Sequence, residues 1–184
     1  MSIALISVYS TDQMMQEYYN IFLYGLLAER EPYQNISHKK MPIFEEHINF
    51  VKSKPYKEWF VIYDTEQKKR VGSVYLTKEN EIGVFISKNQ RKRGFARKAV
   101  LQTMEYFYHV KHIKANIAPT NSTSICFFVN MGFKYDGALL IETAEPKEVG
   151  DLIYKEEIKQ YIYRIINPYY AGSESDLSEQ VAAK

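Results

Sequence analysis

The sequence contains a single cysteine, Cys126, and no apolar run that approaches the ~20 residues of a membrane-spanning helix. One thiol excludes an internal disulfide framework and fits a reducing compartment. The first ten residues lack the basic segment of a signal peptide, and their short apolar run predicts a strand. We therefore expect a cytoplasmic protein that makes no contact with a membrane.

The chain also carries little excess charge, with a formal net charge of +2 at pH 7. Nucleic-acid binding requires a broad basic surface, so no nucleic-acid partner is expected. The basic residues instead gather in two short segments, 52–57 and 88–98, which favours a small charged ligand. The His, Cys and carboxylate residues show no metal-ligand spacing, and we expect no metal.

The pattern of apolar residues predicts an α/β fold in one domain. At 184 residues the chain can bury one sizeable core. Alternating β-rich segments predict strands, and apolar residues at helical spacing predict helices. The expected strands are 3–8, 58–63, 70–77, 82–87, 112–118, 133–141 and 154–165, and the expected helices are 13–29, 43–52, 94–110 and 121–131.

The connections between these elements predict a mixed sheet of about seven strands with flanking helices. Short turns favour antiparallel neighbours among the strands between residues 58 and 87. The helix 94–110 joins two strands, 82–87 and 112–118, which predicts that these two are parallel. We expect one domain over residues 1–166, followed by a disordered C-terminal tail over 167–184.

A basic turn follows the strand 82–87 and is the most informative segment. It contains Gly94 and the small Ala96, directly before a predicted helix. Four basic residues surround them: Arg91, Lys92, Arg93 and Arg97. The first amides of a helix have no partner inside it, and the helix dipole places partial positive charge there. Because glycine lets the backbone approach a ligand closely, the turn predicts a bound pyrophosphate.

Two motifs carry a family resemblance. Residues 91–96 match the pattern Gln/Arg-x-x-Gly-x-Gly/Ala. Residues 121–133 match a second block, in which Asn-x-x-Ser opens a helix that ends at Gly-Phe. In this order and strand–helix context, the chain resembles the GNAT superfamily of acyl-CoA-dependent N-acetyltransferases. The resemblance covers roughly residues 1–166 and implies the GNAT fold, with acetyl-CoA as co-substrate.

The resemblance also implies roles for individual residues. In such enzymes the strand before the turn splays from its neighbour and pairs with the pantetheine arm, here through the backbone of Ile86 and Lys88. The pyrophosphate would lie on the amides of residues 91–97. Asn121 would contact the pantetheine arm or the amine, and two phenylalanines would line the acyl-CoA channel. The implied cofactor residues are Phe85, Ile86, Ser87, Lys88, Arg91, Lys92, Arg93, Gly94, Phe95, Ala96, Arg97, Asn121, Ser124, Phe127 and Phe128.

One position departs from the family pattern. Many members carry a tyrosine four places before the Gly-Phe pair, where it protonates the departing CoA thiolate, but this sequence has Phe128. A phenyl ring has no proton to donate. Another group or a water then supplies the proton, or the thiolate leaves unassisted, which a thiol pKa of ~8.5 makes tolerable near neutral pH.

Acetyl transfer also requires a base that removes a proton from the attacking amine. Glu81 is the first candidate, because it begins the strand that leads to the turn, where related enzymes often place a carboxylate. The alternative is an ordinary glutamate at a strand edge. His38 is the second candidate because the pKa of imidazole suits a base, and its alternative is a surface role. We expect His47 to pack on its helix face and Cys126 to be a buried, inert thiol.

The sequence defines the acceptor less well than the donor. Residues 33–59 mix aromatic side chains with several lysines, which favours a nucleotide-linked amino sugar or another small amine. A polyamine acceptor, which is polycationic, favours a site with more carboxylates than this segment has. Glu45 and Glu46 are the only obvious acidic pair, and both also suit a helix N-terminus. Acetylation of protein N-termini and a non-catalytic acyl-CoA-binding domain are the alternatives. The sequence is compatible with a homodimer.

Overall fold

A computed structural model describes residues 2–9, 13–31, 41–149 and 152–172. Within these ranges the chain forms four α-helices and seven strands. In chain order they are β1 (Ile3–Ser7), α1 (Gln13–Ala28), α2 (Phe44–Lys52), β2 (Tyr56–Asp64), β3 (Lys69–Thr77), β4 (Ile82–Ile86), α3 (Phe95–Tyr106), β5 (His112–Ile117), α4 (Ser122–Asn130), β6 (Lys134–Val149) and β7 (Leu152–Ile166). None of the helices in the described ranges is long and apolar enough to cross a membrane.

The single domain expected over residues 1–166 divides into two compact units. Unit 1 comprises residues 1–29, 41–113 and 166–184, and unit 2 comprises residues 30–40 and 114–165. Unit 1 contains a four-stranded antiparallel sheet in the order β1-β2-β3-β4. Unit 2 contains α4 and the antiparallel β6–β7 pair.

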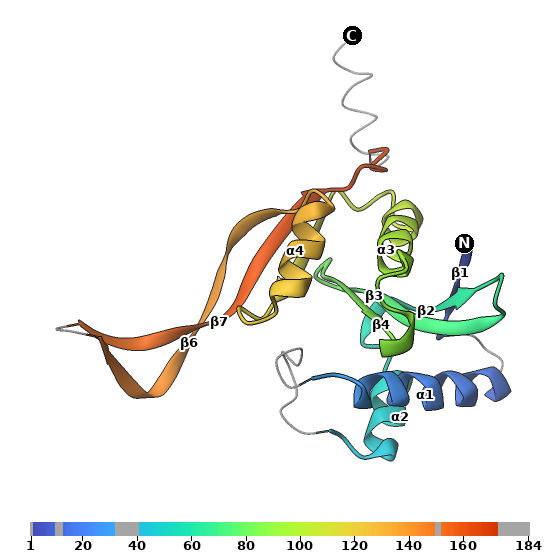
Figure 1. Ribbon diagram of the computed structural model, residues 1–184, viewed down its shortest axis with the longest axis horizontal. Coiled ribbons are helices and arrows are strands. Elements are labelled where there is room, and N and C mark those ends of the chain that lie inside the picture. The colour runs from blue at the N-terminus through green and yellow to red at the C-terminus, as the bar shows by residue number, and fades with distance from the viewer. Residues whose placement is uncertain (1, 10–12, 32–40, 150–151, 173–184) are drawn as a thin grey trace, which may run out of the picture. The chain divides into compact units, whose positions relative to one another are not determined.

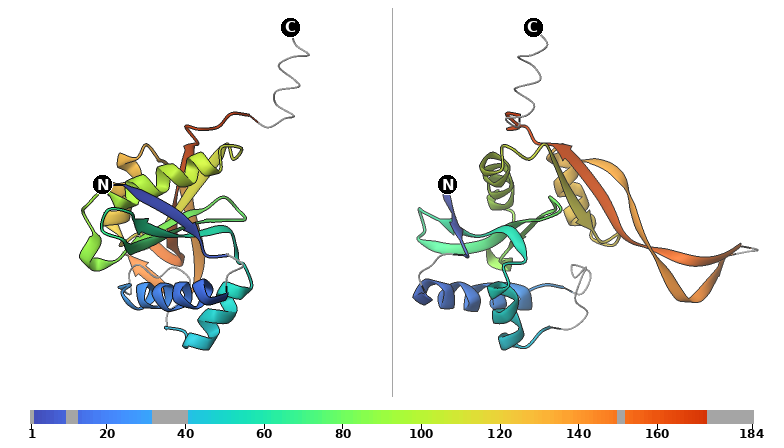
Figure 2. Two further views of the ribbon diagram at one scale, coloured as in Figure 1. Left: turned by 90° about the vertical axis from the view of Figure 1, so that its right-hand side faces the viewer. Right: turned by 180° about the vertical axis from the view of Figure 1, so that it is seen from behind.

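Both faces of the sheet in unit 1 are covered, by α3 on one side and by α1 and α2 on the other (Figures 1 and 2). The sequence of β2 explains why. Side chains alternate between the two faces of a strand, yet every residue from Trp59 to Ile62 is buried. A strand that is apolar on both faces needs a cover on each of them.

An irregularity near the start of β2 brings aromatic side chains together on one face. Tyr56 lies opposite Thr77 and Glu58 opposite Leu76, so the register shifts between them. Such a bulge places Tyr56 and Trp59 on the same face, although they are three positions apart and would lie on opposite faces of a regular strand. Their ring centroids lie 5.1 Å apart, and Tyr56 stacks on Tyr75 at 4.1 Å.

Two glycines allow β3 and β4 to approach each other closely. A Cβ atom on Gly72 would lie 2.3 Å from the carbonyl oxygen of Phe85, and one on Gly83 would lie 2.2 Å from Cζ of Tyr75. Because the Phe85 oxygen belongs to the backbone, glycine is required at position 72, whereas a larger residue at position 83 would have to displace the Tyr75 ring. The Tyr75 ring therefore lies directly over Gly83 of β4.

The parallel pairing expected between β4 and β5 is not formed in the described sheets. β4 is the last strand of the first sheet, whereas β5 begins a separate three-stranded sheet in the order β5-β7-β6. The edge of β4 that a parallel neighbour would use is left at the boundary of its sheet.

Helix α4 ends as predicted at Gly132, which has a left-handed φ of 95°. Phe133 N donates to Phe128 O at 3.0 Å, and Gly132 N donates to Val129 O at 2.9 Å. These two bonds form a Schellman motif, and the Phe128 and Phe133 rings make its hydrophobic contact at 4.9 Å. Cys126 is exposed, which corrects the expected burial, because it lies about 200° around the helix from the buried Phe128.

The structure extends the last two strands beyond their predicted bounds of 133–141 and 154–165. β6 continues through Val149, across a polar segment that contains Pro146. Its pairing with β7, which has three register shifts and reaches Val149 opposite Leu152, supports this extension. Local β-propensity alone does not predict it, because strand formation depends on the partner.

Asn167, which the sequence places in the tail, is a buried part of unit 1. Its side chain is 2% exposed. Nδ2 donates to the carbonyl oxygens of Met104 and Phe107 at 2.9 Å each, and Oδ1 accepts from Tyr169 N at 3.1 Å. The asparagine thus satisfies carbonyl groups at the C-terminal end of α3, where the helix itself cannot. The rest of the predicted tail, residues 173–184, lies outside the described residues.

We expect Asn167→Ala to lower the free energy of unfolding by about 2–3 kcal/mol, because it leaves buried carbonyl groups without donors. Chemical denaturation monitored by circular dichroism measures the loss. Asn49→Ala, at an exposed position on α2, is the matched control and should change stability by less than about 0.5 kcal/mol. Equal effects of the two substitutions would contradict the structural role of Asn167.

Candidate functional site

The outer backbone edge of β4 can pair with an extended ligand. On the inner side, Thr77 N donates to Glu81 O at 2.9 Å, and Ser87 N donates to Val71 O at 2.9 Å. Hydrogen-bonding positions alternate along an antiparallel strand, so residues 82, 84 and 86 direct their backbone groups to the other edge. Ile86 was expected to have this orientation. Val84 shares it and was missed, because only the register with β3 identifies it.

The backbone amide of Lys88 has a partner within the protein. It donates to Oε2 of Glu29 at 2.7 Å. The hydroxyl group of Ser87 donates to Oε1 of the same carboxylate at 2.8 Å. In this structure a carboxylate from the end of α1 therefore occupies the Lys88 N–H group, and the expected pairing of the Lys88 backbone with pantetheine stays a prediction.

The turn after β4 leads into α3 through Gly94, which has a left-handed φ of 78°. Lys92 is also left-handed, with φ of 60°. The first intrahelical bond of α3 runs from Lys98 N to Gly94 O at 3.2 Å. The three amides before it, at residues 95–97, are directed out of the helix end. The sequence predicted a tight glycine turn into a helix here, and the buried Phe95, 1% exposed, anchors this turn to the core.

The arginine side chains of the turn are held by specific contacts. Arg91 Nε donates to Ile86 O at 3.0 Å, and its guanidinium lies 5.1 Å from the Phe85 ring centroid. Arg93 donates to Gln90 Oε1 at 2.6 Å. Among the described residues, the buried Nη2 of Arg91 has no hydrogen-bond partner. A buried guanidinium N–H without a partner fits an anionic ligand, as the phosphates of acetyl-CoA would provide.

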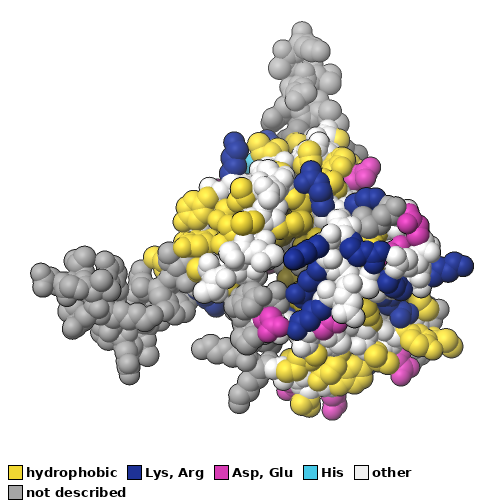
Figure 3. Space-filling view, in the orientation of Figure 1, with side chains coloured by type: hydrophobic (Ala, Val, Ile, Leu, Met, Phe, Trp, Pro, Cys, Tyr) yellow, Lys and Arg dark blue, Asp and Glu magenta, His cyan; other side chains and the backbone are white. Residues whose placement is uncertain are grey.

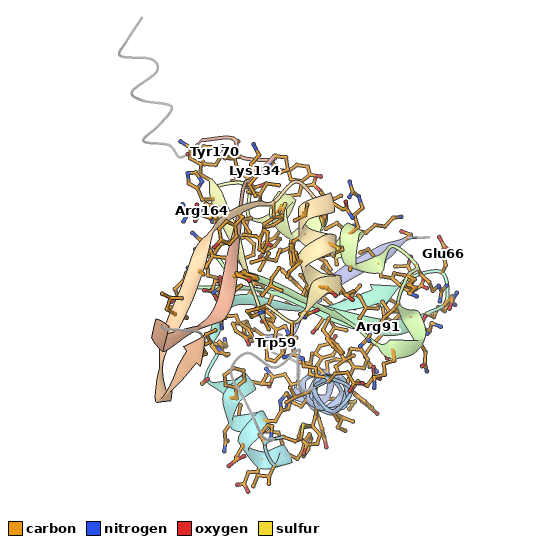
Figure 4. All side chains as sticks on the ribbon, turned by 60° about the vertical axis from the view of Figure 1, so that its left-hand side comes forward. Trp59, Glu66, Arg91, Lys134, Arg164 and Tyr170 are labelled. Atoms are coloured by element: carbon orange, nitrogen blue, oxygen red, sulfur yellow. The ribbon has the colours of Figure 1, made fainter. Side chains whose placement is uncertain are left out.

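Lys and Arg side chains gather on this side of unit 1, over the region of the β4–α3 turn (Figure 3). Arg91 is labelled in Figure 4, within the turn. Lys92 and Arg93 are exposed, and Arg91 is half-buried. The residues present therefore offer both backbone donors and cationic side chains to a pyrophosphate.

Aromatic side chains cover the sheet face that points to α1 and α2, where Figure 4 labels Trp59. His47 of α2 is 4% exposed, and its ring lies 6.5 Å from Trp59 and 5.5 Å from Tyr24. Burial lowers the pKa of His47, partly offset by a hydrogen bond to the backbone of Asn20, which favours a neutral imidazole. The expected packing of His47 on its helix face is confirmed.

Glu81, the first candidate base, lies at the end of β4 opposite the turn. Its amide donates to Thr77 Oγ1 at 3.1 Å, and its side chain is half-buried. Alternation along the strand puts it on the same face as Gly83, which the Tyr75 ring covers. His38, the second candidate, lies outside the described residues.

The candidate residues of unit 2 that the structure describes lie on α4 or cap it. Asn121 is 9% exposed and caps the helix, because its Oδ1 accepts from Ser124 N at 3.2 Å. Phe128 is 5% exposed and packs edge-to-face on Phe127 at 5.0 Å. Within unit 2, Asn121 therefore stabilises the start of α4, and Phe128 packs in its buried face. Their roles toward acetyl-CoA remain predictions.

A model of the family described as "Acetyltransferase (GNAT) domain" matches residues 4–134, more than two thirds of the chain. The chain belongs to the acetyltransferase (GNAT) family. The protein is accordingly an N-acetyltransferase that uses acetyl-CoA as co-substrate. No curated protein matches the sequence significantly.

Solved structures of the family share this fold. A variant of the spermidine N-acetyltransferase SpeG from Vibrio cholerae has a TM-score of 0.65 at 18% identity and covers 92% of this chain and 96% of its own. The V. cholerae enzyme in complex with CoA and spermine has a TM-score of 0.64 at 19% identity, with 91% and 97% covered. An acetyltransferase from Thermus thermophilus has a TM-score of 0.64 at 15% identity, with 90% and 97% covered.

We expect Gly94→Glu to abolish CoA binding, because its carboxylate would face the phosphates and its side chain would strain the left-handed backbone. Isothermal titration calorimetry with CoA measures the loss. Gly25→Glu is the control, since a Cβ atom there meets nothing within 4 Å. CoA affinity that survives in Gly94→Glu would refute the placement of the pyrophosphate.

Proposed function

We propose that this acetyltransferase transfers the acetyl group of acetyl-CoA to a primary amine of a small aliphatic polyamine. The open edge of β4, continuous with the Gly94 turn, supports binding of the donor. The names of similar structures support the acceptor, since several are spermidine N-acetyltransferases and one was solved with spermine. The proposal replaces the amino sugar favoured from the sequence.

The described residues offer features that suit a cationic acceptor. Glu81 adjoins Thr77, which also lies opposite Tyr56. The stacked Tyr56 and Tyr75 rings thus lie on the strands next to this carboxylate, and aromatic faces and carboxylates both attract ammonium groups. The acidic pair at the start of α2 is a weaker candidate, because Glu46 Oε2 already accepts from Ile43 N at 3.0 Å.

The proposed reaction begins with transfer of a proton from the ammonium group to Glu81. The neutral amine attacks the carbonyl carbon of the thioester, the C–S bond breaks and the CoA thiolate leaves. The outward amide of Val84 polarises the thioester oxygen as an oxyanion donor. Alignment of both substrates along one strand contributes through proximity. As the amide forms, its nitrogen loses a second proton, which solvent carries to the thiolate, and Glu81 releases the first proton to solvent. This route is consistent with the phenyl ring at position 128 and a thiol pKa of ~8.5.

The proposed assembly of the enzyme is a homodimer. One similar structure is described as a dodecameric spermidine N-acetyltransferase, with a TM-score of 0.62 and 19% identity, so self-association occurs among proteins of this fold. Light scattering of the purified chain measures the number of subunits directly.

A panel of amines tests the acceptor class. We expect spermidine and spermine to give a kcat/KM at least about tenfold above that of a nucleotide-linked amino sugar or a peptide with a free N-terminus, because two or more ammonium groups can bind at once. Release of free thiol from acetyl-CoA measures each rate. A peptide or an amino sugar as the best substrate would refute the polyamine. CoA binding without amine-dependent release would favour an acyl-CoA-binding domain.

The exchange Glu81→Gln tests the proposed base. It should lower kcat at neutral pH by roughly 10²-fold or more, because the amide cannot accept the proton. CoA affinity should stay unchanged, since the residue lies at the opposite end of β4 from the turn. Glu79→Gln, at an exposed position two residues earlier, is the matched control. Equal rates for the two variants would remove Glu81 from the mechanism.

A further inference from the structure

We propose that Glu29 is a positioning residue for acetyl-CoA, which fixes the first residues of the phosphate-binding turn from the end of α1. The inference rests on the proposed binding of the donor at this turn. In the proposed complex, Glu29 does not touch the phosphates of acetyl-CoA. It acts through Ser87 and Lys88, which it holds in place.

The carboxylate of Glu29 bridges two elements that are far apart in the sequence. Its backbone N–H donates to Gly25 O at 3.1 Å, so the residue continues the last turn of α1. Its Oε1 and Oε2 atoms lie 2.8 and 3.1 Å from Ser87 Oγ, and Oε2 accepts from Lys88 N at 2.7 Å. Both Glu29 and Ser87 are half-buried, so water competes only partly for these bonds. Hydrogen bonds to an ionised acceptor are the stronger kind.

The charge of Glu29 argues for a geometric role. The turn around it carries Lys88 and residues 91–93, all basic, where a phosphate ligand is expected. A carboxylate within a Debye length of about 8–10 Å repels phosphate and lowers the affinity of the turn. Its benefit must therefore come from the conformation that it stabilises.

The conformation of the turn needs anchoring at its start. Gln90 N donates to Ser87 O at 2.8 Å, which begins a single helical turn over Lys88–Gln90. Two residues later, Lys92 adopts a left-handed backbone, which costs energy for a lysine. Glu29 fixes the residues that open this segment, so the amides of residues 95–97 are oriented before the ligand arrives. Such preorganisation lowers the entropy cost of binding.

Position 29 also links the turn before α3 to the aromatic sheet face of unit 1. Helix α1 supplies Tyr19, Leu23 and Leu26 to the core that contains Trp59 of the aromatic face. The same helix ends at the carboxylate that holds the donor turn. One helix, α1, therefore contacts both the start of the phosphate-binding turn and the aromatic sheet face.

The decisive test compares three variants by calorimetry with CoA and with 3′-phospho-ADP, the part of CoA that carries the pyrophosphate. Glu29→Ala should weaken binding of both ligands by roughly tenfold, since bonds to a charged acceptor are lost. Glu29→Gln should stay within about threefold of the native chain, because its amide oxygen still accepts from Lys88 N. Glu17→Ala, at an exposed position on α1, is the matched control and should change nothing.

Steady-state kinetics provide a second readout that a purely structural role would not reproduce. In Glu29→Ala the KM for acetyl-CoA should rise by a similar factor, while kcat and the KM for the amine stay within about twofold. If Glu29→Ala fails to fold, Ser87→Ala removes the hydroxyl donor alone and should weaken CoA binding by about threefold or more.

Unchanged CoA affinity in folded Glu29→Ala, or an equal loss in the Gln and Ala variants, would overturn the proposal. A drop in kcat with unchanged KM for acetyl-CoA would also overturn it. Failure of the native chain to bind CoA is a different result, because it would refute donor binding at the turn and hence the proposed function itself.

Discussion

The whole donor site depends on the fact that β4 is an edge strand. Because β5 begins a separate sheet, the backbone groups of Ile82, Val84 and Ile86 lie at the boundary of the first sheet. The same strand continues into the Gly94 turn and the first amides of α3. In the proposed donor site, one continuous segment, residues 82–97, would recognise both the extended arm and the pyrophosphate. This continuity explains why short sequence motifs identify the family.

The contacts of Glu29 with the turn and the aromatic sheet face differ from this continuous segment, because each joins parts of unit 1 that are distant in sequence. Glu29 reaches Ser87 across 58 positions of sequence. A bulge in β2 turns Tyr56 toward Tyr75, and Gly83 leaves room for that ring. α2 adds His47, whose pKa is lowered by burial. None of these contacts has a local sequence pattern, because each requires two elements to be in register.

The accuracy of the sequence-based predictions follows the same division. The helix stop at Gly132 and the turn at Gly94 were predicted correctly, because left-handed backbone and glycine go together. The hydrogen bond between the Lys88 amide and Glu29 was not predicted, since the carboxylate lies at the end of a helix that is distant in sequence. The burial of Cys126 was wrong because apolar neighbours do not reveal which face of α4 is covered. The extent of β6 was missed because its partner strand, rather than its own residues, determines it.

The sequence alone determined the order of the elements, the glycine turn before α3 and the family, since each depends on neighbouring residues and on backbone preferences. The tertiary structure decided that the outer edge of β4 has no neighbouring strand in its sheet. It also decided that the Glu29 carboxylate binds Ser87 and the Lys88 amide. Those properties depend on strand register and on contacts between distant side chains. The donor can therefore be read largely from local sequence, whereas the acceptor surface depends on β2, β3 and α2 packing together.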